Sequence, residues 1–168
     1  MPRLIDGKAQ LLDNPWVLFA KDSTLEAVLA ATDSHLLIPA SLWLAHKPEL
    51  LNAGKQLAVW LDSDQPASLI ASELGELSMI ALNFPQFMDG RAYSTAVILR
   101  KHFHYKGELR AIGDVLRDQL FMMKRCGFTT FDLRDSVKLE DARTAFNDFT
   151  TNYQATVETP EPLFRRRG

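Results

Sequence analysis

The chain has very little cysteine: Cys126 is the only one among its 168 residues. A single thiol cannot form an intramolecular disulfide, and this usage is typical of a reducing compartment. Nor can one thiol ligate an iron–sulfur cluster, which needs several cysteines. We expect neither an iron–sulfur nor a haem ligation set, and any redox cofactor would be bound non-covalently, as a flavin can be.

Long apolar runs and an excess of one charge are also missing. No segment approaches 18 consecutive apolar residues, and the charged start at residues 1–6 lacks the apolar run of a signal peptide. The net charge of −2 and the pI of about 6.1 provide no global field that attracts nucleic acid. We therefore expect a cytoplasmic protein with neither a membrane nor a nucleic-acid partner.

Motifs with a specific catalytic spacing do not occur. The sequence contains no G-x-x-x-x-G-K-[ST], G-x-G-x-x-G, H-E-x-x-H or G-x-S-x-G. His102 and His104 have no acidic or cysteine partners at a recognised metal-ligand spacing, so no metal site is predicted. Cys126 precedes Gly127 at a predicted helix end, where a buried and inert thiol is expected.

What remains is the composition of an ordinary globular domain. Hydrophobic residues make up 46% of the chain and charged residues 24%, which suits one domain with a substantial core. We assign a single α/β domain to residues 1–155. Residues 156–168, with two prolines and a run of three arginines, are expected to form a flexible C-terminal tail.

From residue 55 onward strands and helices alternate. Apolar runs bounded by turn residues predict strands at 57–61, 78–82, 108–112 and 130–133, and amphipathic patterns predict helices at 66–74, 91–103, 114–125 and 139–153. Strands joined by helices of this length are parallel, with right-handed crossovers. The pattern favours an open doubly wound sheet, with a partial barrel-like sheet as the second choice. In both folds ligands bind at the carboxyl ends of the strands.

The first third of the chain is less regular. Residues 1–15 look like a polar lead-in, followed by short strands at 16–19 and 36–38. Ser23 to Glu26 match a capping box that would open a helix. Pro48 should kink or split a later helix, because proline removes a backbone donor and clashes with the preceding turn.

Asp89 and Arg91 flank a glycine just before the predicted helix at 91–103. A helix N-terminus attracts anions, and an arginine fork adds bidentate contacts to phosphate, sulfate or carboxylate. The alternative is an ordinary N-cap followed by a surface arginine.

Arg110, Asp114 and Asp118 are three further candidates for a ligand site. Arg110 lies on the strand face opposite to its neighbours Leu109 and Ala111, either aimed at a ligand or paired with Glu108, Asp114 or Asp132. Asp114 is expected to be the N-cap of the following helix. Asp118 lies off the apolar stripe of that helix, so the alternative is a solvated carboxylate paired with Arg117, Arg125 or the preceding helix.

The same region carries a resemblance to a known family. The matching residues are Phe84, Pro85, Asp89, Gly90, Arg91, Tyr93, Ser94, Leu99, Arg100, Tyr105, Gly107–Ala111, Gly113–Leu116, Asp118–Leu120 and Arg125–Phe128. In this respect the chain resembles the bacterial family catalogued as domain of unknown function 934. The resemblance is dense over residues 78–133 and looser over 36–153.

The resemblance implies an oxidoreductase or an accessory protein of assimilatory sulfite reduction, acting with sulfite reductase. It brings no assigned cofactor or catalytic residue. The alternative is a non-catalytic α/β module that binds a small anion or a partner protein, including a second copy of itself as a homodimer. Open sheet edges would favour such association.

Overall fold

A computed structural model of the chain describes residues 3–85 and 90–147. Within these residues eight strands form one sheet, in the order β2-β1-β8-β7-β6-β5-β4-β3. The strands are β1 Arg3–Asp6, β2 Leu11–Leu12, β3 Trp16–Leu18, β4 His35–Pro39, β5 Gln56–Leu61, β6 Met79–Phe84, β7 Glu108–Gly113 and β8 Thr130–Leu133. The helices are α1 Leu25–Ala30, α2 Ala40–Leu51, α3 Arg91–Lys101, α4 Leu120–Cys126 and α5 Leu139–Phe146, with 3₁₀ segments η1 Ala67–Glu76 and η2 Arg117–Gln119.

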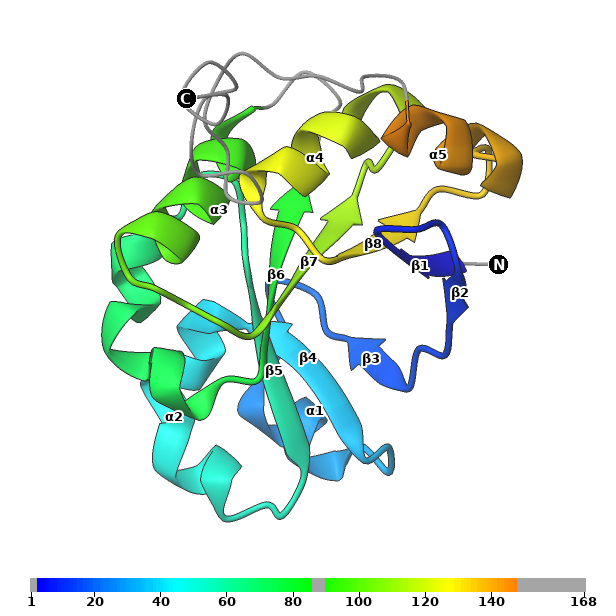
Figure 1. The fold of residues 1–168 in the computed structure, drawn as a ribbon. Helices are drawn as coiled ribbons and strands as arrows, with labels where there is room; N and C mark the ends of the chain where they lie inside the picture. Colours follow the sequence, from blue (N-terminus) through cyan, green and yellow to red (C-terminus); the bar gives the residue numbers. More distant parts are fainter. Residues whose placement is uncertain (1–2, 86–89, 148–168) are drawn as a thin grey trace.

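The order of the parallel strands decides between the two predicted sheets. Strands β3 to β8 are parallel and adjacent in chain order, so every crossover steps in the same direction. Right-handed crossovers that never reverse direction put all connecting helices on one face, and the sheet curls away from them. Figure 1 shows the helices outside a curled sheet. The fold is a half-barrel, the second of the two alternatives; a doubly wound sheet would need a reversal of strand order.

A three-residue link at 13–15 limits the distance between the two edges of the sheet. It joins β2 and β3, which are the two opposite edges of the sheet. Four Cα–Cα steps of about 3.8 Å cannot separate Leu12 and Trp16 by more than roughly 15 Å. Eight flat strands would separate the edges by about 33 Å. The sheet therefore brings its two edges close together, as Figure 1 shows for β2 and β3.

Side chains alternate between two faces of the half-barrel. The convex face packs against the helices and forms the larger core, with Ile80, Leu82 and Phe131 at 1% exposure or less. The concave face carries a smaller apolar cluster of Leu37, Ala58, Trp60, Met79, Ala81 and Ile112, with Trp16 from β3 packed against it. The inside of the half-barrel is therefore filled by side chains, as in small barrels generally.

The prediction of a polar lead-in over residues 1–15 is wrong. Strand β1 pairs antiparallel with β8, Ile5 opposite Phe131, and β2 pairs antiparallel with β1. Both strands are too short to show an alternating pattern in the sequence. Ile5 is nevertheless fully buried, because pairing with β8, whose Phe131 lies 126 residues later in the chain, places it in the larger core.

Two predicted helix caps are also wrong. The N-cap of α1 is Thr24, whose Oγ1 accepts the amide hydrogen of Ala27 at 3.2 Å, and not Ser23. The helix expected to start at Asp114 begins instead with η2, whose N-cap is Leu116; Gln119 Oε1 accepts the Leu116 amide at 3.1 Å. The effect predicted for Pro48 is confirmed, since α2 is kinked at His46, with φ −133° and ψ 28°.

The family-like core, 36–153, and the single domain assigned to 1–155 both extend past the last described residue. The tail at 156–168, and the end of the helix predicted at 139–153, lie outside the described residues. Among the helices in the described part of the chain, none has both the length and the apolar character needed to cross a bilayer.

Candidate functional site

The carboxyl ends of the parallel strands form one edge of the half-barrel, and polar side chains gather there. We call Lys21, Asp62, Ser63 and Asn83, which follow or end strands β3, β5 and β6, the Asp62 cluster. Asp62 Oδ2 lies 3.0 Å from Lys21 Nζ, and its Oδ1 accepts hydrogen bonds from Asn83 Nδ2 at 3.1 Å and the Ser63 amide at 2.9 Å. The carboxylate is thus fixed from three directions.

The surroundings of Asp62 keep it ionised. Burial alone would raise the pKa of this carboxyl, whose side chain is 18% exposed. Hydrogen bonds from Asn83, Lys21 and the Ser63 backbone outweigh burial and lower the pKa below its ordinary value. Asp62 is therefore a fixed negative charge beside the positive charge of Lys21. The sequence could not show this pair because the two residues are 41 positions apart.

Arg91 stands at the first position of α3, as predicted. Its Nη2 donates to Ser63 Oγ at 3.0 Å, which ties the guanidinium to the end of β5. The N-cap of α3 is Gly90, which has no side chain to accept hydrogen bonds from the first helical turn. Asp89, the predicted N-cap and a candidate ligand-binding residue, lies outside the described residues. The structure thus brings a cation and a helix N-terminus together at the carboxyl edge.

Asp114 also lies at this edge, but over β7 and β8. Its carboxylate forms an ion pair with Arg134, the residue after β8, and its amide donates to the Phe84 carbonyl oxygen at 2.7 Å. The side chain is 14% exposed. A surface pocket of about 450 Å³ adjoins this pair and is lined by Leu133, Arg134, Asp135 and Ser136. Asp118, in contrast, is 80% exposed and pairs with its neighbour Arg117, so it lies apart from both groups.

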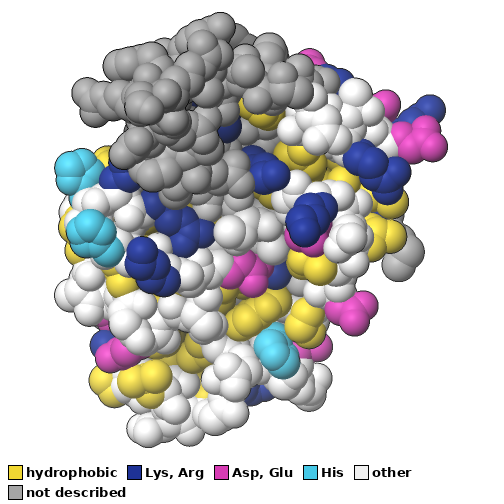
Figure 2. All heavy atoms as spheres, in the orientation of Figure 1, with side chains coloured by type: hydrophobic (Ala, Val, Ile, Leu, Met, Phe, Trp, Pro, Cys, Tyr) yellow, Lys and Arg dark blue, Asp and Glu magenta, His cyan; other side chains and the backbone are white. Residues whose placement is uncertain are grey.

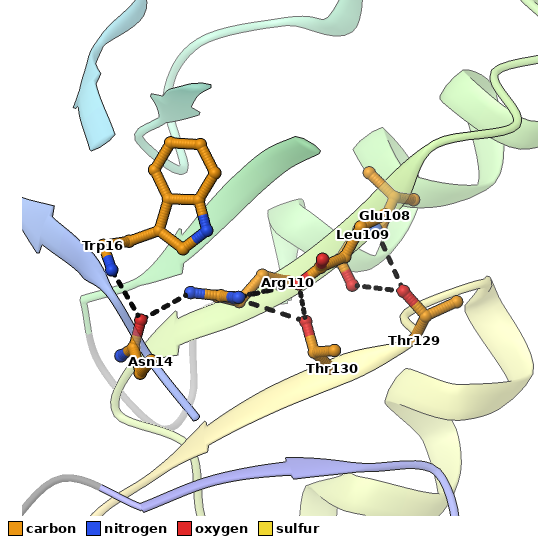
Figure 3. Close-up of polar contacts among 7 residues, drawn as sticks. All are labelled: Asn14, Trp16, Glu108, Leu109, Arg110, Thr129 and Thr130. Atoms are coloured by element: carbon orange, nitrogen blue, oxygen red, sulfur yellow. Dashed lines mark hydrogen bonds and ion pairs between the residues drawn. The ribbon is translucent and has the colours of Figure 1, made fainter. Parts of the chain in front are cut away.

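Arg110 lies inside the half-barrel and is only 4% exposed (Figure 3). Its Nη2 forms an ion pair with Glu108 Oε2 at 2.8 Å, and its Nη1 donates to Asn14 Oδ1 at 3.1 Å. Thr130 Oγ1 donates to the same Glu108 oxygen at 2.7 Å. Of the partners that the sequence allowed, Glu108 is the one that bonds. Asn14, on the link between the sheet edges, was not foreseen.

Asp132 is a carboxylate that sequence reasoning considered only as a partner of Arg110. It lies beside Leu4 on the neighbouring strand β1 and one pleat beyond Thr130 on the concave face. Within the described residues no side chain or backbone group hydrogen-bonds to its carboxylate. Burial raises the pKa of Asp132. The positive charge of Arg110 offsets part of this increase, and the negative charge of Asp135 adds to it.

Several residues that carry the family resemblance have structural roles. Arg100 Nη1 donates to the carbonyl oxygens of Tyr105 at 2.9 Å and Gly107 at 2.8 Å. Tyr105 Oη donates to the Leu77 carbonyl oxygen at 2.8 Å. A Cβ on Gly107 would stand 2.2 Å from that tyrosine oxygen. These contacts hold the loop between α3 and β7 in place. The family resemblance at these residues therefore reflects the shared fold and not a binding site.

The other sequence candidates offer no chemistry in the structure. Burial raises the pKa of the Cys126 thiol despite Arg125 and Lys101, so the reactive thiolate is disfavoured. His102 and His104 are both exposed at the end of α3. In the described parts of the chain, no three histidine, cysteine, aspartate or glutamate side chains are placed to hold a metal ion.

Comparisons with known proteins give one relationship. Neither the curated proteins nor the solved structures contain a match to this chain. A family model described as bacterial protein of unknown function (DUF934) matches residues 58–164, which is more than half of the chain. The match spans β6 to β8 and includes Arg91, Arg110 and Asp114. The chain belongs to this DUF934 family of bacterial proteins.

Proposed function

We propose that this protein binds a small oxyanion at the carboxyl edge of its half-barrel and acts as an accessory protein of assimilatory sulfite reduction. The observation that carries the proposal is the position of Arg91. It lies at the N-terminus of an eleven-residue helix, at the strand edge where β/α folds bind their ligands, and Ser63 orients it there. Sulfite is an anion of the right size and charge for such a place.

The chemistry of the edge supports anion binding more than catalysis. An arginine fork and the amide groups of the first turn of α3 can both donate hydrogen bonds to one oxyanion. Lys21 adds positive charge from the end of β3, partly balanced by Asp62. Asp114 and Arg134 form a second charged pair farther along the same edge.

The sulfite assignment comes from the family resemblance of residues 78–133. A chain with one cysteine has no iron–sulfur ligation set of its own. Electrons for sulfite reduction would therefore pass through sulfite reductase, with this protein acting on substrate or product. A tightly bound flavin would instead make it an oxidoreductase in its own right, and the visible spectrum of the freshly purified protein distinguishes the two.

A non-catalytic role as an interaction module is the second candidate. The specific observation in its favour is that leucines on both edge strands are open to solvent: Leu11 on β2 is 59% exposed and Leu18 on β3 is 55% exposed. Edge strands with exposed apolar side chains are surfaces for pairing with another chain. Native mass spectrometry would show a stable dimer if this surface joins two copies.

Sulfite titration monitored by calorimetry tests the binding proposal. We expect saturable binding by the wild-type protein and a loss of about tenfold or more in affinity for Arg91→Ala, because one charge-assisted bidentate contact is removed. Lys101→Ala is the control, since it removes a positive charge at the opposite end of the same helix. Equal affinity of the wild-type protein and Arg91→Ala would contradict the proposal.

Growth of the bacterium tests the pathway. Deleting the gene should impair growth on sulfate or sulfite as sulfur source but not on cysteine, and the wild-type gene should restore it. The Arg91→Ala gene should fail to restore growth while its product accumulates normally. Equal growth of the deletion strain on all three sulfur sources would rule out the role in sulfite reduction.

A further inference from the structure

A second polar pocket lies at the opposite end of the half-barrel from the carboxyl edge. It has a volume of about 310 Å³ and is lined by Gly7, Lys8, Lys124, Arg143, Phe146 and Asn147. Gly7 and Lys8 follow β1, whose last residue, Asp6, pairs with the first residue of β8. The other lining residues come from the last turns of α4 and α5 and the residue after α5. Three separate parts of the chain therefore meet at this pocket.

The turn that carries Lys8 is held rigidly. Asp6 Oδ1 accepts the amide hydrogens of Lys8 at 2.8 Å and Gln10 at 3.0 Å, and the Asp6 carbonyl oxygen accepts the amide of Ala9 at 3.1 Å. Ala9 is buried and has a positive φ of 61°. The Asp6 carboxylate thus points toward the backbone amides of its own turn. The backbone of Lys8 is fixed at the pocket, while its side chain is exposed.

Lys124 is a lining residue whose ammonium group has defined contacts. Its Nζ donates to the Gly7 carbonyl oxygen at 3.2 Å and lies 5.6 Å from the centre of the Phe146 ring. A Cβ on Gly7 would stand 3.2 Å from Lys124 Cε, so glycine lets the turn approach the lysine closely. This arrangement places the Lys124 ammonium at a defined point between β1 and α5.

The charge of the pocket is one-sided. Lys8, Lys124 and Arg143 line it, and among the lining residues that the structure describes there is no carboxylate. Within residues 3–85 and 90–147, the side chains of Lys8 and Arg143 make neither an ion pair nor a hydrogen bond. Cations near helix C-termini are favoured by the helix dipole, which accounts for Lys124 and Arg143. It does not account for Lys8, which is on a turn.

On the face drawn in Figure 2, the lysine and arginine side chains lie mostly in the upper half, where α4 and α5 lie in Figure 1, and aspartate and glutamate side chains lie among several of them. The basic lining of the pocket is thus a local arrangement in a protein whose net charge is −2.

From this pocket we propose a site for a phosphate group, carried by a small phosphorylated molecule. Three cations around one opening match a doubly charged tetrahedral oxyanion: the arginine can donate two parallel hydrogen bonds and each lysine acts as a point charge. A volume of about 310 Å³ exceeds the needs of a lone ion and falls within the range of small-molecule sites. The Phe146 ring and the Asn147 amide provide an apolar wall and a further donor for the organic part.

Calorimetric titration of the full chain, at constant ionic strength, tests the site. The probes are inorganic phosphate and phenyl phosphate, and chloride is the reference anion. We expect saturable binding of both probes, with phenyl phosphate the tighter. Lys8→Ala and Arg143→Ala should each weaken binding about tenfold, the effect of one lost charge-assisted hydrogen bond. Lys138→Ala, an exposed cation at the start of α5 and outside the pocket, should change the affinity less than twofold.

Two outcomes would overturn the proposal: no saturable binding of either probe at millimolar concentration, or unchanged affinity in Lys8→Ala and Arg143→Ala. Circular dichroism of each variant checks that it is folded, and both substitutions are at exposed positions where folding should survive. The site is separable from the carboxyl edge. Arg91→Ala should retain phosphate binding, and Arg143→Ala should retain sulfite binding.

Discussion

Arg100 and Gly127 are joined by two hydrogen bonds: Nε and Nη2 of the arginine donate to the glycine carbonyl oxygen at 3.0 Å and 2.8 Å. Gly127 ends α4 in a left-handed conformation, with φ 113°, and a Cβ there would stand 2.6 Å from Arg100 Cγ. The arginine on α3 can lie over the end of α4 because this residue has no side chain. Helices α3 and α4 are thereby fastened to each other.

Gly127→Ala should therefore be strongly destabilising. The left-handed backbone costs a residue with a Cβ about 1–2 kcal/mol, and displacing Arg100 costs a further 1.5–3 kcal/mol, roughly 2.5–5 kcal/mol in all. Gly54→Ala is the matched control: its φ is also positive, at 72°, but nothing lies within 4 Å of the added Cβ. It should cost only about 1 kcal/mol. Urea unfolding measures both, and equal losses would show that the contact with Arg100 is unimportant.

Glu108→Gln should cost more stability than Arg110→Met. Losing the carboxylate leaves the guanidinium of Arg110, 4% exposed, with the neutral hydrogen-bond partners Asn14 and Thr130. Losing the arginine leaves a Glu108 that is 33% exposed and can be hydrated. Breaking a fully buried pair costs about 3–5 kcal/mol, and partial exposure of Glu108 reduces this to about 2 kcal/mol. Urea unfolding of both variants provides the comparison, and a larger loss for Arg110→Met would contradict it.

Asp132→Asn should stabilise the protein at neutral pH. Because burial raises the pKa of Asp132 in the folded state, the folded chain binds this proton more tightly than the unfolded chain. Stability then falls as the pH rises from the ordinary pKa of 3.8 through the raised value, and the asparagine variant should lack this fall.

Unfolding free energies measured between acidic and neutral pH reveal the difference. Asp118→Asn is the control, because this carboxylate is 80% exposed and its replacement should change stability by less than about 0.5 kcal/mol. An Asp132→Asn variant that is no more stable than the wild-type protein at neutral pH would contradict the prediction, because it would show that burying the charged carboxylate costs no stability.

Two tyrosines should resist ionisation until the protein unfolds. Burial raises the pKa of Tyr93 and Tyr105 to about 12 each, above the ordinary value of 10.0. Since the unfolded chain loses these protons first, stability should fall as the pH rises from 10 to 12, by about 2–3 kcal/mol for Tyr105. The phenolate absorbance during an alkaline titration should rise together with loss of circular dichroism. Ionisation of two tyrosines well before unfolding would contradict the prediction.

Much of the fold could be predicted because its elements are encoded locally. Strand β7 and helix α3 each follow from an apolar pattern of the right period, and the kink near Pro48 follows from the chemistry of proline. Strand order depends on contacts between elements, so the sequence left two kinds of sheet open. Strand β1 was missed because its stability comes from β8 and not from its own four residues.

The candidate site was harder to predict for the same reason. The alternation of side chains along the strand places Arg110 on the face opposite to Leu109 and Ala111, and Glu108, two residues away on the same face, is among its expected partners. The contact of Arg91 with Ser63 joins residues 28 positions apart, and that of Arg110 with Asn14 joins residues 96 apart. No spacing rule reaches that far, so both partners became visible only in the folded chain.

The antiparallel pairing of β1 with β8 sets a limit on when the chain can finish folding during synthesis. Arg3 leaves the ribosome first among the paired residues, yet its partner, Leu133, is made 130 residues later. Until then β1 has no neighbour on that side, and Ile5 cannot be covered. Folding dominated by such distant contacts is slow and leaves unpaired strands exposed. The N-terminal strand of this protein should therefore be the last to join the sheet, although it is the first to be made.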